Sequence, residues 1–287
     1  MSTGADLLVE ALYRLGVRVI FGMPGSHTTS IYDAIYRHGG IRTILSRNEQ
    51  AGAFMADGYA RVTGWPGVVC TTAGPGATNA LTGIAEAYGD SVPVLLIAGQ
   101  VNHDKVGKET GSYHEIDLES IFRPCTIYTD TAESADDGPA MVSEALTAMV
   151  SERRRSAALF FPQDLMARLT DEPLPEVAGD VAHRKLYQPN EVVALTVGML
   201  QHARRPIIMA GGGAVWSGAG KEIAQLAERL NCPVITTLNG KGILDERNLF
   251  SLGHARSARA KEALPHADAM LAVGCRFTEV TTWFWKL

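Results

Sequence analysis

Six short apolar runs in the first 165 residues constrain the fold of this chain more than any other feature. They occupy residues 17–22, 41–45, 67–72, 93–99, 125–129 and 157–161. Each run is apolar on both faces, and stretches with helical periodicity separate the runs. Strands of this kind are typical of a parallel sheet that is covered by helices on both faces. The pattern therefore predicts an α/β fold with a doubly wound, six-stranded parallel sheet.

A change of composition marks the end of this domain. Residues 169–190 are rich in proline and acidic residues and lack apolar periodicity, which is typical of an interdomain linker. The sequence therefore predicts a first domain over residues 1–168 and a second domain over residues 191–287.

The second domain repeats the alternation over a shorter length. Its strand-like runs occupy residues 206–212, 233–238 and 269–275. Residues 220–231, between the first two runs, have the periodicity of an amphipathic helix. We expect a truncated, incomplete Rossmann-like α/β domain, in which three visible strands form a sheet with an open edge that another segment covers.

Charge and hydropathy argue against nucleic acid and membranes as partners. Lys and Arg total 26 against 31 Asp and Glu, so the formal net charge is −5 and there is no basic patch to attract nucleic acid. The apolar runs are far shorter than a bilayer span. Residues 1–17 indicate an amphipathic helix capped by Ser2 or Thr3, and not a signal peptide. We therefore expect a cytoplasmic protein.

Cysteines and ligand clusters give no sign of a metal centre. Cys70, Cys125, Cys232 and Cys275 are widely separated and form no C-x-x-C pair. Neither a zinc site nor a disulfide framework is indicated. No histidine or carboxylate cluster has metal-ligand spacing, and no G-x-S-x-G nucleophile motif is present. We expect no metal ligands on this chain.

The loops after the strands are where an open parallel sheet binds ligands. After the first strand, "GMPGSHTT" (22–29) predicts a tight turn that leaves Ser26 and His27 at the rim of the sheet. The alternative is a plain turn in which Ser26 or Thr28 caps the next helix.

A glycine-rich loop, "TTAGPGATN" (71–79), follows the third strand. Gly74 and Gly76 allow the backbone to approach a ligand, and the following helix offers N–H groups to an anion. The loop is neither a P-loop nor a dinucleotide fingerprint, because G-K-[ST] is missing and Asn79 stands where a third glycine would be. The run Gly211–Gly213 also lacks a third fingerprint glycine, so NAD binding is not favoured.

A long polar segment (99–117) follows the fourth strand. A loop of this length in a compact domain is usually functional or mobile. Its polar groups are His103, Lys105, Lys108, His114 and Glu115. A surface histidine is more often incidental than catalytic, so the loop alone does not decide between these two interpretations.

Glu49 lies between the second strand and a helix of small and apolar residues. Ser46 and Glu49 have the spacing S-x-x-E of a capping box, in which both side chains only close the helix end. The alternative is a role in proton transfer. Small residues at positions 51, 52, 53 and 56 shield the carboxylate from water, which favours a shared proton.

Four stretches occur in a characteristic order along the chain. They are "FGMPGS" (21–26), "RNEQAGAFMADGYAR" (47–61), "TAGPGATNALTGIAEAYGDSVPVLLIAGQ" (72–100) and "LAERLNCPVITTLNGKG" (226–242). Together they resemble the large subunit of acetolactate synthase and related thiamine-diphosphate-dependent 2-oxo acid enzymes. The resemblance is collinear over essentially all 287 residues.

The resemblance implies a pyrimidine-binding domain in the first part of the chain and a central domain in the second. It implies that Glu49 bonds a ring nitrogen of thiamine diphosphate and promotes loss of the proton from the thiazolium carbon. It further implies that six residues line the pyrimidine beside Glu49: Met23, Pro24, Gly25, Thr72, Pro75 and Asn79.

Departures from the family pattern surround the expected reaction centre. Tyr113, His114 and Glu115 stand where acetolactate synthases have Phe-Gln-Glu, Ser26 replaces a glycine, and Gln163 replaces a frequent lysine. We therefore expect an altered acceptor pocket. The candidate catalytic residues are Glu49, His114, Ser26 and His27. The flavin motifs of the central domain are only partly matched, so FAD is a possible second cofactor.

The G-D-G motif, which in the family holds the diphosphate through Mg²⁺, does not occur in the sequence. Either a partner chain supplies that domain, in a hetero-oligomer built on a dimer of pyrimidine-binding domains, or the chain is a fragment. The expected activity is decarboxylation of a 2-oxo acid such as pyruvate, followed by transfer of the acyl unit, by a carboligase active only with its partner. The alternative is a non-catalytic regulatory or binding subunit with the same fold.

Overall fold

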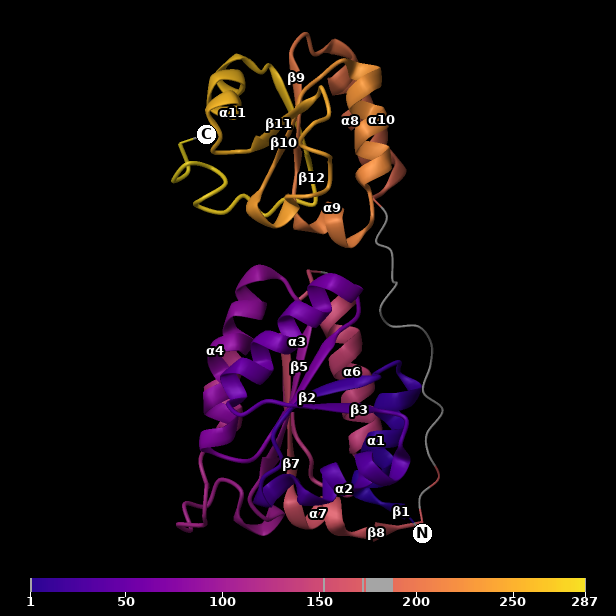
Figure 1. Cartoon of the computed structure of the whole chain (residues 1–287), viewed down its shortest axis with the longest axis vertical. Helices are drawn as coiled ribbons and strands as arrows, with labels where there is room; N and C mark the ends of the chain where they lie inside the picture. The colour runs from indigo at the N-terminus through magenta and orange to yellow at the C-terminus, as the bar shows by residue number, and fades with distance from the viewer. Residues whose placement is uncertain (1, 152, 172, 174–187, 287) are drawn as a thin grey trace. The chain divides into compact units, whose positions relative to one another are not determined.

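The computed structural model describes residues 2–151, 153–171, 173 and 188–286. The chain forms two compact units, residues 1–184 and 185–287. Each is an α/β unit, as predicted (Figure 1). Within the described residues, no helix combines the length and the apolar character that crossing a membrane requires.

The first unit contains a six-stranded sheet in the order β3-β2-β4-β5-β7-β6, and all neighbouring strands are parallel. The strands are β2 (Val19–Gly22), β3 (Arg42–Leu45), β4 (Gly67–Thr71), β5 (Val94–Gln100), β6 (Tyr128–Thr131) and β7 (Ala157–Pro162). Each coincides with one of the six apolar runs. β4, β5 and β7 are buried along their whole length, as strands apolar on both faces require. The predicted sheet is confirmed.

Helices cover both faces of this sheet (Figure 1). They are α1 (Gly4–Arg14), α2 (Thr29–His38), α3 (Glu49–Thr63), α4 (Pro75–Asp90), α5 (Leu118–Phe122), α6 (Gly138–Ser151) and α7 (Gln163–Ala167), with short 3₁₀ turns η1 (Ser26–Thr28), η2 (His103–Lys105) and η3 (Arg123–Cys125). α1, α2 and α6 lie on one face, whereas α3 and α4 pack together on the other (Figure 1). Leu8, Ile35 and Leu146 belong to the core cluster of the first face and are almost fully buried.

A short antiparallel pair closes the first unit. β1 (Ser2–Thr3) pairs with β8 (Leu169–Thr170), which the sequence did not predict because two-residue strands have no periodicity. Thr3 then caps α1 through a capping box with Asp6, as one of the two predicted caps. β8 contains the first two residues of the predicted linker 169–190. Residues 172 and 174–187 of that linker lie outside the described residues, so its boundaries stay a prediction.

The second unit contains a parallel sheet in the order β11-β10-β9-β12. Its strands are β9 (Pro206–Ala210), β10 (Val234–Thr236), β11 (Ser251–His254) and β12 (Ala269–Val273). Its helices are α8 (Asn190–His202), α9 (Gly212–Trp216), α10 (Gly220–Leu230) and α11 (Ala258–Ala263), with 3₁₀ turns η4 (Leu238–Gly240) and η5 (Leu264–His266). The expectation of three strands was wrong. β11 was missed because "SLGH" has a single large apolar residue and a glycine.

Glycines set how closely α3 and α4 approach each other and the sheet. A Cβ atom on Gly83 of α4 would lie 2.6 Å from the Cβ of Ala53 of α3. A Cβ on Gly67 at the start of β4 would lie 2.0 Å from the carbonyl oxygen of Ala56. Both distances are below any normal carbon contact, so the packing of α3 depends on small residues opposite it.

We expect Gly83→Ala to lower the free energy of unfolding by about 1–3 kcal/mol, because the added methyl group overpacks the contact with Ala53. Gly58→Ala is the matched control, since Gly58 lies inside α3 with no heavy atom within 4 Å of its added Cβ. That change should raise stability by about 0.5–1 kcal/mol through helix propensity. Urea denaturation of the two variants measures the difference. Equal stabilities would contradict the packing argument.

Candidate functional site

Loops from four parallel strands meet at the carboxyl edge of the first sheet. β2 leads into the turn before η1, β3 into the start of α3, β4 into the glycine-rich loop before α4, and β5 into the segment 101–117. Parallel strands end at the same edge, so these segments become neighbours although they are far apart in sequence.

Glu49 is the first residue of α3 and is 8% exposed. The side-chain nitrogen of Asn79, on α4, donates a hydrogen bond to its Oε2 atom at 3.1 Å. The Oε1 atom faces Gly76, where an added Cβ would lie 3.5 Å away. One carboxylate oxygen is therefore held in place, whereas the other accepts no hydrogen bond within the described residues and lies beside a glycine that also contacts the Thr72 side chain.

The capping-box interpretation of Ser46 and Glu49 was wrong. Asn48 is the N-cap of α3, and its Oδ1 atom accepts the backbone N–H of Ala51 at 3.2 Å. Because the helix begins at Glu49, this residue occupies the first helical position and not the third, which the capping box requires. The hydroxyl of Ser46 is buried and has no hydrogen-bond partner among the described residues. The carboxylate is therefore not used to close the helix.

The small residues after Glu49 serve the packing of α3. Gly52 faces the hydroxyl of Ser46, at 2.8 Å from an added Cβ, and Ala53 contacts Gly83. Ala53 and Ala56 are fully buried, whereas Ala51 is exposed. These residues exclude water by close contact with β4 and α4. Gly76, on α4, lies beside the carboxylate, and its missing side chain permits the approach of the Thr72 methyl group, which would lie 2.6 Å from an added Cβ.

Ser26, His27 and Thr72, from the loops after β2 and β4, form a row of hydroxyl and imidazole groups at this edge. The Nδ1 atom of His27 lies 3.1 Å from the hydroxyl of Ser26 and 3.3 Å from the hydroxyl of Thr72. His27 is 5% exposed. Its backbone and Cβ lie against Gly99 of β5, where an added Cβ would be 2.6 Å from the His27 Cβ. Gly99, which the sequence analysis did not single out, thus allows a histidine to be buried at the strand ends.

The segment 101–117 brings His114 to this row. The rings of His27 and His114 are stacked with centroids 5.6 Å apart, and Tyr113 stacks on His114 at 3.8 Å. The carbonyl oxygen of His114 would lie 2.6 Å from a Cβ on Gly74, so only glycine permits the contact. The Nδ1 atom of His114 is buried and lacks a hydrogen-bond partner in the part of the chain that the structure describes.

Other polar groups of this segment have structural contacts. Glu115 accepts hydrogen bonds from the backbone N–H groups of Thr110 and Ser112, at 3.1 and 2.9 Å. The side chain of His103 is exposed, and its backbone N–H donates a hydrogen bond to Asp164 at 2.8 Å. Lys108 is exposed as well. These three side chains do not join the row at the strand ends.

The apolar residues expected to line a ring lie on the same loops. Gly25 packs against Thr72, with 2.5 Å between its added Cβ and the Thr72 Cβ. Met23 is half-buried, whereas Pro24 and Pro75 are exposed. Pro75 begins α4 at its first turn. The structure thus forms two contact groups at this edge, Glu49 with Asn79 and His27 with Ser26, Thr72 and His114, and Gly76 lies next to both Glu49 and Thr72. The roles of all the candidate site residues stay predictions.

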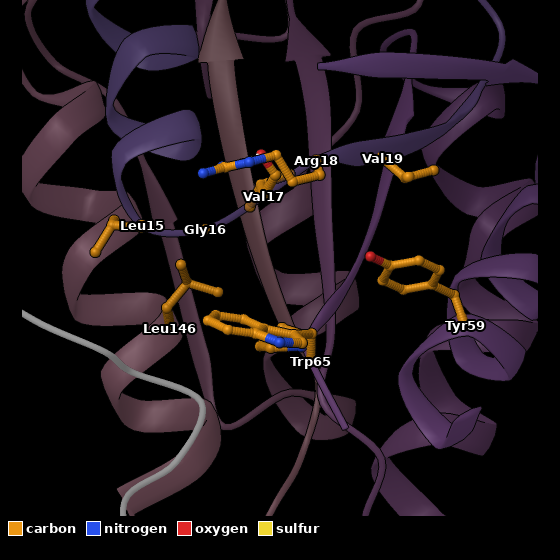
Figure 2. A pocket seen from close by; sticks show the side chains of 9 residues that line it. Leu15, Gly16, Val17, Arg18, Val19, Tyr59, Trp65 and Leu146 are labelled. Atoms are coloured by element: carbon orange, nitrogen blue, oxygen red, sulfur yellow. The ribbon is translucent and has the colours of Figure 1, made fainter. Parts of the chain in front are cut away.

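A pocket lies at the opposite edge of the sheet (Figure 2). Its lining includes Gly16 and Arg18, just before β2, and Trp65, just before β4, with Tyr59 and Leu146. These residues precede the strands, so the pocket is at the amino edge and is separate from the row around Glu49. Arg18 donates to the carbonyl oxygens of Tyr13 and Val17, and its charge is thereby satisfied locally.

Glycines of the second unit also have packing roles. A Cβ on Gly211 would lie 2.2 Å from the carbonyl oxygen of Gly274, and one on Gly240 would lie 2.1 Å from that of Ala210. At the carboxyl ends of β10 and β11, in the second sheet, Thr236 Oγ1 and His254 Nε2 are buried without a hydrogen-bond partner among the described residues.

No group of three or more His, Cys, Asp or Glu residues that could hold a metal ion occurs in the described residues.

The arrangement around Glu49 favours proton sharing with a bound group. One of its oxygens is fixed by an amide, and the other is open to a donor such as a protonated ring nitrogen. The low exposure of the carboxylate strengthens such a hydrogen bond. The hydroxyl and imidazole groups of Ser26, Thr72, His27 and His114 add donors and acceptors on the neighbouring loops.

Two sequence models of thiamine pyrophosphate enzymes match this chain. The N-terminal TPP binding domain matches residues 2–121, and the central domain matches residues 193–286. The six-stranded unit therefore corresponds to the first domain, and the described part of the second unit corresponds to the central domain.

Acetolactate synthases are among the similar curated proteins. The large subunit from Buchnera aphidicola subsp. Acyrthosiphon pisum is 37% identical over 288 residues, which cover 98% of this chain and 50% of the relative. The enzyme from Arthrospira platensis is 40% identical over 96% of this chain and 50% of its own length. The isozyme 3 large subunit from Escherichia coli is 35% identical over 98% and 50%. The chain spans about half the length of these relatives.

We expect His27 to titrate below its ordinary pKa of 6.5. Burial disfavours the charged imidazole and repulsion from His114 adds to this effect, whereas a hydrogen bond to the Tyr113 backbone opposes it. Between this lowered pKa and 6.5 the unfolded chain binds more protons, so the contribution of His27 to stability is complete above pH 6.5 and is lost as the pH falls.

An NMR titration of the imidazole C–H signals measures this pKa. His114→Gln should move the His27 midpoint upward, because it removes the repulsion and leaves the burial. His103→Gln, in the same loop but exposed, should leave the midpoint where it is. A wild-type midpoint at or above 6.5 would contradict the assignment.

Proposed function

The chain belongs to the thiamine pyrophosphate enzyme family, and from this premise we propose that its first unit binds the pyrimidine half of thiamine diphosphate. The activity proposed for the assembled enzyme is decarboxylation of a 2-oxo acid and transfer of the acyl unit, as in acetolactate synthases. The observation that carries this proposal is the buried Glu49 carboxylate, with Oε2 bound by Asn79 and Oε1 beside Gly76.

The residues present fit the pyrimidine half of the cofactor. Oε1 of Glu49 accepts no hydrogen bond within the described residues and is available to a ring nitrogen, and a Cβ on Gly76 would lie 3.5 Å from it. Thr72 and Gly25 form the adjoining wall through their close contact. Thiamine diphosphate, when bound, supplies the electron sink that a 2-oxo acid requires for loss of carbon dioxide.

Glu49 would hold a proton at the ring nitrogen of the bound pyrimidine. Its Oε1 atom accepts or donates there according to which partner carries the proton, and Asn79 keeps the carboxylate in one orientation through Oε2. Burial by α3 and α4 excludes water that would compete for the same oxygen. The residue thus serves as a proton-sharing group, whereas Asn79 positions it.

The other half of the cofactor site is proposed to lie on a partner polypeptide. The acetolactate synthases that match are about twice as long as this chain, and their other half is the proposed source of the domain that holds the diphosphate and Mg²⁺. On α3, Phe54 and Met55 expose 41% and 42% of their surface, which supports a contact between two pyrimidine-binding domains. We propose a hetero-oligomer built on that contact.

The substrate proposal rests on the names of the relatives, and the cofactor proposal rests on the second unit. The relatives are named acetolactate synthases, which supports a 2-oxo acid such as pyruvate as substrate. His114 at the reaction centre supports an acceptor pocket different from theirs. FAD is the second cofactor proposed, supported by Thr236 Oγ1 and His254 Nε2, which are buried without a hydrogen-bond partner among the described residues. Four free cysteines support a reducing, cytoplasmic location.

A non-catalytic subunit with the same fold is the competing proposal. It requires no carboxylate at position 49, because burying a charged group lowers stability unless the group is paired or has a function. The pairing of Glu49 with a neutral amide only partly compensates for its burial. This observation favours the catalytic proposal.

We expect Glu49→Gln to lower the activity of the assembled enzyme at least about 100-fold, because the amide cannot share a proton with the ring. The melting temperature should change little, since the amide oxygen still accepts the hydrogen bond from Asn79. Steady-state decarboxylation of pyruvate and thermal unfolding measure the two effects. Glu86→Gln, an exposed change on α4, is the matched control. A fully active Glu49→Gln enzyme would rule out the proposed role.

We expect this chain alone to bind thiamine diphosphate weakly, and to bind it tightly with Mg²⁺ once a polypeptide equivalent to the other half of the relatives is added. Isothermal titration calorimetry with and without that polypeptide measures the affinities. Tight binding by this chain alone would contradict the division of the site between two polypeptides.

A further inference from the structure

The second sheet has two edge strands of different character. Its order β11-β10-β9-β12 leaves β11 at one edge and β12 at the other. β11 contains Gly253 in the left-handed region, with a φ of 77°, and the register of β10 with it shifts between Val234 and Thr236. A glycine and an irregular register are features by which proteins protect an exposed edge from further pairing. β11 therefore has the character of a terminal strand.

β12, in contrast, has the sequence of a strand from the interior of a sheet. Its residues, Ala269–Val273, are all apolar, as in strands that are covered on both faces. Among the described residues it pairs only with β9, and none of its residues is fully buried. β9, which has a neighbour on each side, is buried from Ile207 to Ala210. An edge without glycine, proline or charge is open to a further strand.

Helix α8, which contacts β12, has the same mismatch between composition and burial. Apolar residues occur around the whole helix, and a helix of this kind is normally buried. None of the residues of α8 is buried, and Leu195 and Met199 expose 68% and 62% of their surface. Val192, Val193 and Val197 are exposed as well. These five side chains and strand β12 form one apolar surface, which we call the β12 surface.

A β-strand with its crossover helix matches both parts of the β12 surface. All neighbouring strands of this sheet are parallel, and a further parallel strand requires a crossover connection, which is usually a helix. The strand would pair with β12, and the helix would cover α8 with an apolar face. The relatives are about twice as long as this chain, so their other half is long enough to contain such a unit.

A second copy of this chain matches the β12 surface less well. Two copies related by a two-fold axis would pair their β12 strands antiparallel. Every other pair in this sheet is parallel. A two-fold contact would therefore interrupt the pattern that the rest of the sheet follows.

We propose that the β12 surface is the docking site of an apolar β-strand and its helix from the polypeptide that supplies the other half of the enzyme. The strand lies parallel to β12 and extends the second sheet, and the helix buries the exposed side chains of α8. The existence of that polypeptide is part of the proposed function, on which the docking site rests.

Hydrogen exchange with mass spectrometry locates the contact. The full chain is mixed with the polypeptide that corresponds to the other half of the relatives. A peptide covering residues 268–274 should exchange at least about 10-fold more slowly than in the free chain, because new backbone hydrogen bonds protect its amides. A peptide covering residues 250–255, at the β11 edge, should be unchanged. A complex in which β12 exchanges as in the free chain, or in which β11 is protected instead, would overturn the docking site.

Leu195→Glu and Met199→Glu test the part of the surface on α8. Both side chains are exposed, so the melting temperature of the free chain should change little. The Kd for the added polypeptide, from isothermal titration calorimetry, should rise at least about 10-fold, because docking would bury a carboxylate against apolar side chains. Leu249→Glu is the matched control, since Leu249 precedes β11 and is 86% exposed. An unchanged Kd in both α8 variants would contradict the proposal.

Exchange of the free chain at low and at high concentration tests the second copy as occupant. β12 should exchange equally fast at both concentrations. Protection of β12 at high concentration, lost in Leu195→Glu, would identify a second copy as the occupant and would overturn the proposal.

Failure of the proposed function gives a different result. If β12 became protected on mixing but the assembled enzyme turned over no 2-oxo acid, the proposed function would fail and the docking site would stand. Turnover with β12 exchanging as in the free chain would overturn the docking site alone. A polypeptide that did not bind this chain at all would overturn both.

Discussion

The parallel pairing of β2 with β3 on one side and β4 on the other is the constraint on which the candidate site depends. Gly22, the last residue of β2, is in register with Leu45 of β3 and with Cys70 of β4. β4 continues to Thr71, which pairs with Ala98 of β5. Neighbouring strands are about 5 Å apart, so the loops after them begin within contact distance of one another. Groups from residues 26 to 114 are therefore brought to one edge of the sheet.

The carboxyl edge of this sheet also requires glycines, because its loops approach one another more closely than side chains would permit. Gly22 has a φ of 147°, and an added Cβ would lie 2.0 Å from the Cys70 carbonyl oxygen. Gly74, Gly76 and Gly99 similarly accept His114, Thr72 and His27. The polar side chains that these contacts bring together include a carboxylate, two hydroxyls and two imidazoles. Within the described residues, Ser46 Oγ and His114 Nδ1 are buried at this edge without a hydrogen-bond partner, which supports the proposal that a ligand completes the surface.

The sequence predicted the six-stranded sheet well because each strand is apolar on both faces and long enough to stand out. It failed where that signal is weak. β11 contains one large apolar residue, and the pair β1 and β8 is too short for any period. The start of α3 was misplaced for another reason, because Ser46 and Asn48 are both favourable N-cap residues. The direction in which the chain leaves β3 decides which of the two caps the helix, and this direction depends on the tertiary structure.

By itself, the sequence determined the α/β class, the six strands of the first sheet in chain order, and the loops in which a ligand site with Glu49 is expected. These follow from periodicity and residue type, which are local. Only the tertiary structure decided that Asn79 holds one oxygen of Glu49 while the other lies beside Gly76, and that the ring of His27 stacks on those of Tyr113 and His114. Such pairings join residues 27 to 87 positions apart, and no local pattern encodes them. They arise because parallel strands bring distant loops to one edge, where sterics and hydrogen bonding select which side chains meet.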